Sequence, residues 1–251
     1  MSSWSQRRKT MYLSIAAIIL VGAVIVPLFL IFYKAPTCTD GIKNGNELAV
    51  DCGGSCQRLC QNAFLPAKLG WTRFAEVAPG LYNVAAYIEN PNSEGEAYNV
   101  PYRLTLYDDR GIIIIETTGK LTLPPHRNTL AFQGAVSVGK RVPVRALFEF
   151  AANPVWYKAV DTLSNLIIGE KNYVEDESGS SLTVTLKNSS NKPIVNTSVY
   201  VILYDKEGNA LGFSKTIVDI VPPLGSALAP YTWPRIHDGK VISFEVLPVA
   251  E

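Results

Sequence analysis

The sequence predicts an all-β protein, in which two tandem immunoglobulin-like β-sandwich domains follow an N-terminal transmembrane helix. Three observations support this: an uncharged apolar segment near the N-terminus, four clustered cysteines after it, and two copies of one strand pattern in the remaining residues. We therefore divide the chain into a cytoplasmic tail (1–10), a transmembrane helix (11–33), a cysteine-rich stalk module (35–62) and two β-sandwiches (64–152 and 153–251).

The apolar segment is residues 11–33, which include no charged side chain. As an α-helix it would be about 34 Å long, enough to cross a hydrocarbon core of ~30 Å. A cleaved signal peptide usually has an apolar region of only about 7–15 residues and a small-x-small cleavage site, so we expect an uncleaved anchor. Three basic residues (7–9) precede the segment and only Lys34 closely follows it. By the positive-inside rule, the N-terminus is cytoplasmic and the C-terminal domains are extracytoplasmic.

This topology divides the formal net charge of +1. Residues 1–34 hold four basic and no acidic side chains, whereas the remaining residues hold 19 basic and 22 acidic ones, a net charge of −3. A mildly acidic exterior does not attract nucleic acid. We therefore expect the membrane as one partner and no nucleic-acid partner.

The cysteines lie close together after the apolar segment, at Cys38, Cys52, Cys56 and Cys60. Outside the cytoplasm, an even number of clustered cysteines predicts two disulfides. Four cysteines allow three pairings, and the spacing does not choose among them. A zinc site is less consistent with the sequence, because it has neither paired C-x2-C motifs nor a nearby histidine.

Between these cysteines, short oxygen-bearing side chains alternate with glycines. Calcium binds carboxylate and carbonyl oxygens on tightly folded loops, so the candidate calcium ligands are Asp40, Asn44, Asn46, Glu47 and Asp51. The alternative is a disulfide-stapled turn whose Asx side chains bond their own backbone. The segment 38–56 resembles the C-x-D-G-x-x-N-x-x-E-x-x-x-D-C-G-G-x-C module of many extracellular and cell-surface proteins, which implies an extracellular spacer.

The rest of the chain contains an internal duplication. A hydrophobic-x-Leu-Tyr-Asp-x-x-Gly segment ends at Gly111 and again at Gly208, an offset of 97 residues. An earlier Asn, a Pro-Pro pair, a Leu-Ala pair and a Phe-Glu pair (Phe148-Glu149 and Phe244-Glu245) recur in the same order at offsets of 96 to 98. The repeat-defining turn residues are Asn90, Tyr107, Asp108 and Gly111 in the first copy, and Asn188, Tyr204, Asp205 and Gly208 in the second.

Each copy is expected to be all β. Residues 181–187 alternate strictly between apolar and polar, which is typical of a half-buried strand. In each Tyr-Asp-x-x-Gly segment the Asp opens a hairpin turn and the Gly supplies a positive φ. Residues 112–115 are four isoleucines, expected as a buried strand, or alternatively as an exposed edge that pairs with another chain. Short strands separated by turns over about 90 residues predict a two-sheet sandwich.

The recurring pattern resembles the bacterial F-x-L-Y-D domain family. Both copies depart from it at the first position, where Leu104 and Val201 replace Phe. An aliphatic residue can fill the same core position, so the fold tolerates this change. The resemblance implies small immunoglobulin-like sandwiches on bacterial envelope proteins, and it carries no catalytic residues with it.

No catalytic or nucleotide-binding motif is present, and we expect no enzyme, no catalytic residue, no small-molecule substrate and no cofactor other than calcium. His126 and His237 are expected in surface loops, Asp108 and Asp205 as turn residues, and 175–177 as a solvated acidic loop. The sequence therefore predicts a non-catalytic, membrane-anchored envelope protein that binds or scaffolds another envelope or surface protein. The alternatives are an architectural stalk or assembly subunit and, less consistent with the sequence, an accessory part of an extracytoplasmic hydrolase.

Overall fold

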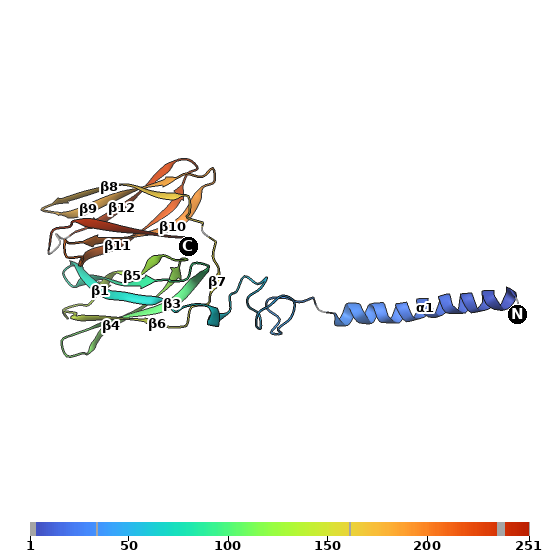
Figure 1. Ribbon diagram of the computed structural model, residues 1–251. Helices are drawn as coiled ribbons and strands as arrows, with labels where there is room; N and C mark the ends of the chain where they lie inside the picture. The colour runs from blue at the N-terminus through green and yellow to red at the C-terminus, as the bar shows by residue number, and fades with distance from the viewer. Residues whose placement is uncertain (1–3, 34, 161, 235–238, 251) are drawn as a thin grey trace.

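The structure is a computed structural model that describes residues 4–33, 35–160, 162–234 and 239–250 (Figure 1). Helix α1 (Trp4–Phe32) points away from the β-rich body, and its apolar span is not buried against any other element. The helix begins at Trp4 rather than at the predicted residue 11, because the mainly polar residues 4–10 are also helical. The span Gln6–Phe32 is long and apolar enough to cross a membrane, as an anchor or as a signal sequence would be.

The body is built from antiparallel strands, which confirms the predicted all-β fold. After the 3₁₀ turn η1 (Gln61–Ala63), the first sandwich contains β1 (Lys68–Ala78), β2 (Leu81–Glu89), β3 (Gly95–Tyr107), β4 (Ile113–Leu123), β5 (Asn128–Ser137) and β6 (Arg145–Phe150). The short β7 (Tyr157–Lys158) lies in the linker. The second sandwich contains β8 (Leu166–Asp176), β9 (Gly179–Asn188), β10 (Ile194–Tyr204), β11 (Ala210–Val221), β12 (Ser226–Trp233) and β13 (Ser243–Ala250).

The two sandwiches have the same topology, as a duplication requires. In the first, sheet β1-β2-β5 faces sheet β4-β3-β6, and β7 adds to β3. In the second, sheet β12-β9-β8 faces sheet β11-β10-β13. The predicted alternation is present, because Leu182, Val184 and Leu186 are all fully buried in the second core. Leu104 and Val201, which stand where the F-x-L-Y-D pattern has Phe, are also buried in their respective cores.

The register of the last strands corrects one element of the predicted duplication. Leu104 pairs with Phe148, whereas the equivalent Val201 pairs with Val246 rather than with Phe244. The two Phe-Glu pairs are therefore displaced by two residues relative to each other. Because a shift of two keeps a side chain on the same face of a strand, both aromatic rings still point toward their own core, and the sequence match was misleading.

The four isoleucines at 112–115 are not a fully buried strand. Ile113 begins β4, an edge strand of its sheet, Ile112 precedes this strand, and both residues are half exposed. The guanidinium group of Arg141 donates hydrogen bonds to the carbonyls of Ile113 (3.1 Å) and Ile114 (2.6 Å). These bonds tie the start of this edge strand to the loop that holds Arg141.

The sandwiches are stacked face to face rather than strung end to end (Figure 1). The outer face of β1-β2-β5 packs on the outer face of β11-β10-β13 through a third buried cluster, separate from the two sandwich cores. Its buried members are Ala85, Leu130, Tyr200, Ile202, Phe213, Leu247 and Val249. The body is therefore four layers of sheet, with β4-β3-β6 and β8-β9-β12 on the outside.

Candidate functional site

The repeat-defining residues hold equivalent turns in both sandwiches. The Oδ1 atom of Asp108 accepts hydrogen bonds from the backbone N–H groups of residues 110 and 112, and that of Asp205 accepts them from residues 207 and 209. Gly111 and Gly208 have φ of 74° and 80°, which favour glycine. The lowered pKa of Asp205, caused mainly by the Asn209 side chain, reflects this bonding. These carboxylates are therefore engaged in local structure.

Asn90 and Asn188 join the start of the third strand to the end of the fourth in each copy. The buried Asn90 amide donates to the carbonyls of Gly95 and Pro124, both at 2.8 Å. The Asn188 amide donates to the carbonyls of Lys192 (2.7 Å) and Val221 (3.2 Å). Both residues are almost fully buried, and Asn90 in particular supplies hydrogen-bond donors to buried carbonyls.

The cysteine-rich module is closed by two disulfides, Cys38–Cys56 and Cys52–Cys60. This selects one of the three pairings that the sequence left open. The glycine at position 54 is required by this packing, because a Cβ there would lie 1.6 Å from the Asn46 carbonyl oxygen and its φ is +59°. Glu47 lies beside the Cys38–Cys56 bond, whose sulfurs are not free thiolates.

Of the candidate calcium ligands, the carboxylates of Asp40, Glu47 and Asp51 accept hydrogen bonds from the module's own backbone. Both Asp51 carboxylate oxygens accept the Gly41 N–H (3.0 and 3.1 Å), and Glu47 Oε2 accepts the N–H groups of Asn44 and Asp51. The Asn44 side chain donates to Asp40 Oδ2 at 2.8 Å. This bond, followed by the N–H groups of residues 42 and 37, lowers the pKa of Asp40. The arrangement is a network of Asx-type turns around the disulfides.

The module is docked onto the linker between the sandwiches. The Leu59 N–H donates to the Trp156 carbonyl and the Lys158 N–H to the Gln57 carbonyl, both at 2.8 Å. The Lys158 ammonium group donates to the Gly54 carbonyl at 2.8 Å. Because β7 also pairs with the start of β3, the module, the linker and the first sandwich are joined by continuous hydrogen bonding.

The surface between the sandwiches combines aromatic contacts with a polar clamp. Phe213 of the second sandwich lies between Trp71 and Phe132 of the first, at ring distances of 6.1 and 6.4 Å. Its carbonyl accepts a bond from the Asn83 amide at 3.0 Å. Nearby, Glu245 accepts the hydroxyls of Tyr87 and Tyr204, both at 2.8 Å. Burial, followed by these bonds, raises the pKa of both tyrosines.

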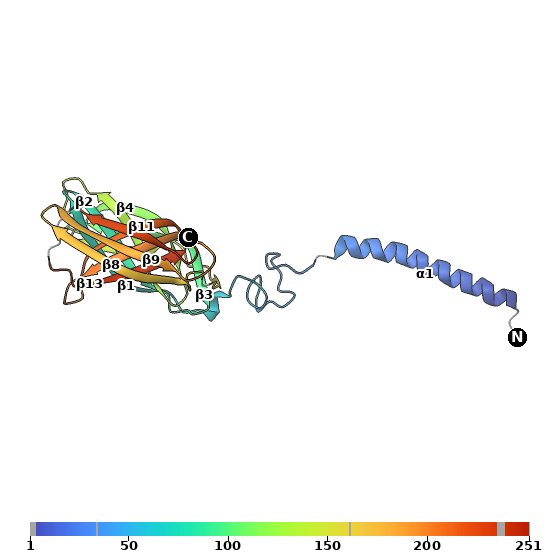
Figure 2. The same cartoon turned by 90° about the horizontal axis from the view of Figure 1, so that it is seen from above.

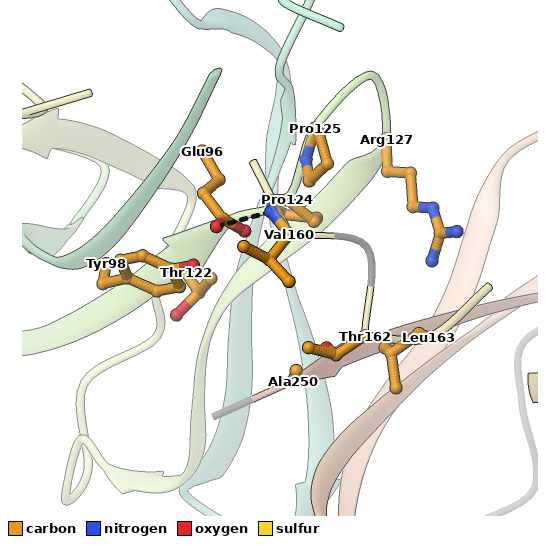
Figure 3. A pocket seen from close by; sticks show the side chains of 10 residues that line it. All are labelled: Glu96, Tyr98, Thr122, Pro124, Pro125, Arg127, Val160, Thr162, Leu163 and Ala250. Atoms are coloured by element: carbon orange, nitrogen blue, oxygen red, sulfur yellow. Dashed lines mark hydrogen bonds between the residues drawn. The ribbon is translucent and has the colours of Figure 1, made fainter. Parts of the chain in front are cut away.

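A pocket of about 190 Å³ lies where the linker passes between the sandwiches (Figure 3). Its main polar feature is the buried carboxylate of Glu96, which accepts the Val160 N–H at 3.0 Å and is hydrogen-bonded to Tyr98. The described lining residues include no serine, cysteine or histidine. Glu96 therefore holds the linker through its bond to the Val160 N–H.

The remaining predicted residues lie apart from one another. His126 is exposed in the turn before β5, where its N–H donates to the Asn92 carbonyl. Residues 175–177 are exposed at the β8–β9 hairpin. His237 lies outside the described residues.

Sequence reasoning did not identify the residues between the sandwiches, such as Phe213 and Glu245. One pattern could have indicated them: residues 199–204 (VYVILY) are apolar or aromatic at every position. Such a run is typical of a strand buried on both faces, and β10 packs on its own core with one face and on the first sandwich with the other.

These features define a class of protein: an all-β chain of two stacked sandwiches, with a disulfide-bonded module and an N-terminal helix able to span a membrane. Comparison of the sequence with known proteins does not narrow this class, because no protein-family model and no curated protein matches it.

Proposed function

We propose that this chain is a membrane-anchored envelope protein that presents its two β-sandwiches outside the cytoplasm and binds or scaffolds another envelope or surface protein. The observation that carries the proposal is the joining of module, linker and both sandwiches into one body behind an apolar helix. A body of this kind presents fixed surfaces at a set distance from the membrane.

The topology follows from two supports. The basic residues 7–9 precede the helix, which favours a cytoplasmic N-terminus. Two disulfides follow it, and disulfides persist in oxidising compartments. Labelling with a membrane-impermeant lysine reagent tests this: in intact cells, Lys140 and Lys187 should react and Lys9 should not. Labelling of Lys9 alone would contradict the topology.

Membership of the F-x-L-Y-D family remains part of the proposal. Its support is that Tyr-Asp-x-x-Gly forms the same hydrogen-bonded turn twice and that the aliphatic residues at the Phe position are buried core residues. The absence of catalysis is proposed on related grounds, because Asp108 and Asp205 are engaged in turns and Glu96 binds the linker.

For the cysteine-rich module, we favour the disulfide-stapled turn over a calcium site, because Asp40, Glu47 and Asp51 already accept backbone hydrogen bonds. Calorimetric titration of the full chain in detergent with Ca²⁺ should give no saturable heat. A saturable signal that is lost in Asp51→Asn would instead support calcium binding.

Cross-linking in intact cells, followed by affinity purification and mass spectrometry, tests the binding role. A reproducible cross-linked protein partner is expected, with its cross-links on the body rather than on the helix. Recovery of only uncross-linked monomer would contradict the proposal. The architectural alternative predicts that substitutions in exposed loops are harmless, whereas deletion of residues 166–250 is not.

A further inference from the structure

The two sandwiches differ at the end of the body that lies away from α1 (Figures 1 and 2). In the first sandwich this end carries the β3–β4 turn and the β5–β6 loop. Four aliphatic residues there, Ile112, Ile113, Val142 and Val144, are each at least half exposed. We call these four residues the distal patch.

The distal patch is a single surface, because hydrogen bonds join its two loops. Arg141, from the β5–β6 loop, bonds the carbonyls of Ile113 and Ile114 in β4. The Val144 N–H donates to the Tyr107 carbonyl at the end of β3 (2.9 Å), and the Arg145 guanidinium lies 4.4 Å from the Tyr107 ring centre. An exposed aliphatic surface held in place in this way is typical of an interaction site.

Basic residues lie close to the distal patch in the chain. Arg110, Lys140 and Arg141 lie in the same two loops and Arg145 begins β6, against Asp108 and Asp109. Asp108 is engaged in its turn, and Asp109 lies 3.9 Å from Arg110 in a fully solvated pair. The local charge is therefore positive, although the chain beyond the helix is net acidic, so the patch favours an acidic partner.

The same end of the second sandwich has the opposite character. A hollow of about 310 Å³ lies beside the β8–β9 hairpin, lined by Val174, Asp176 and Trp233 among others. Glu175 and Glu177 flank Asp176 in this hairpin and are exposed. The Ser178 hydroxyl lowers the pKa of Asp176, which keeps this carboxylate charged. The lining is mainly polar, with Ser178, Ser180, Ser181 and Thr232, and Trp233 is itself buried, so the hollow is a polar surface with acidic side chains beside it.

We propose that the distal patch of one copy of this chain docks into the hollow beside the β8–β9 hairpin of a second copy. The argument is charge complementarity: the basic residues beside the distal patch match the acidic residues beside the hollow. Each copy carries both surfaces, so two reciprocal contacts close a symmetric pair. If both copies are anchored in one membrane, their distal ends lie at the same height above it, which raises the effective concentration of each surface near the other.

This inference names a partner for the proposed binding role and therefore rests on it. A photo-cross-linking amino acid at position 142 of the full chain, expressed in cells, should give a dimer whose cross-link maps to residues 174–181. The control carries the same amino acid at position 228, an exposed site on an outer face of the second sandwich, and should give no such dimer. Cross-links from position 142 to other proteins only would overturn the inference and leave the binding role standing. No cross-link at all would count against both.

Charge reversal gives the second test, by sedimentation of the full chain in detergent at low salt. Arg110→Glu with Lys140→Glu, or Glu175→Lys with Glu177→Lys, should each weaken self-association on the order of tenfold, since rim charges become repulsive. An equimolar mixture of the two variants should form mixed pairs that regain both contacts, one with the native charges and one with the charges exchanged. Lys187→Glu is the matched control and should leave association unchanged. If neither reversal affects self-association, the inference is overturned, because the contact between the two copies would then lie elsewhere, for example in the helix.

Discussion

Phe213→Ala offers a direct test of the stacking between the sandwiches. Phe213 is almost fully buried, yet its ring contacts Trp71 and Phe132 of the other sandwich rather than the core of its own. Truncation of a buried Phe costs about 3–5 kcal/mol, through lost transfer free energy and the cavity left behind. Because this loss falls on the surface between the sandwiches, it should weaken their association and leave each core intact.

Urea unfolding of the full chain in detergent, followed by tryptophan fluorescence, measures this effect. We expect one cooperative transition in the wild type and two in Phe213→Ala, together with faster tryptic cleavage after Lys158 in the linker. Val184→Ala is the matched control, because it removes a buried side chain from the second core alone and should lower stability without separating the transitions. A loss below about 1 kcal/mol in Phe213→Ala, or unchanged cleavage of the linker, would refute the reasoning.

Three further predictions concern the turns, the polar clamp and the module. Asn90→Ala should lower the stability of the first sandwich by at least about 2 kcal/mol in urea unfolding, because buried carbonyls lose their donors, whereas the exposed Asn172→Ala should change it little. The pKa values of Tyr87 and Tyr204 are raised in the folded chain, so folding favours their neutral hydroxyls. The stability that these two hydroxyls contribute is complete below the unfolded pKa of about 10 and is lost as the pH rises above it. Unfolding between pH 8 and 11 should show a loss that is smaller in Tyr87→Phe with Tyr204→Phe, and an equal loss in that variant would contradict the assignment. Reduction of the disulfides should speed hydrogen exchange of the Lys158 amide about thirtyfold, equivalent to ~2 kcal/mol of local stability, with the Val201 amide in β10 as the unaffected reference.

The features that local chemistry determines could be predicted from the sequence. All of the uncharged segment 11–33 except its last residue lies within α1, and alternation at 181–187 places three side chains in the second core. The Asp and Gly of each repeat form turns whose hydrogen bonds close within five residues. For these elements, the residues that decide the structure are adjacent in the chain.

Contacts between distant residues could not be predicted in the same way. The pairing of Asn83 with Phe213 joins positions 130 residues apart, and no periodicity reports such a partner. The Phe-Glu pairs misled because strands in equivalent places can hold aromatic residues two positions apart and still fill a core. The disulfide pairing likewise depended on how the loop folds around Gly54, which the spacing of the cysteines does not specify.

The stacking uses different faces of the two copies, and such a contact, repeated, would build an endless fibre. Each outer face is the duplicate of a face that is buried inside. In β3, Arg103 and Thr105 occupy the positions that Tyr200 and Ile202 hold in β10, and Arg103 lies 3.3 Å from Glu116. On the opposite side, Thr183, Thr185 and Lys187 alternate along the outer face of β9. These faces mix polar side chains with isolated apolar ones such as Leu228, and they act as the caps of a two-unit array, because a third sandwich would need a continuous apolar outer face to extend it.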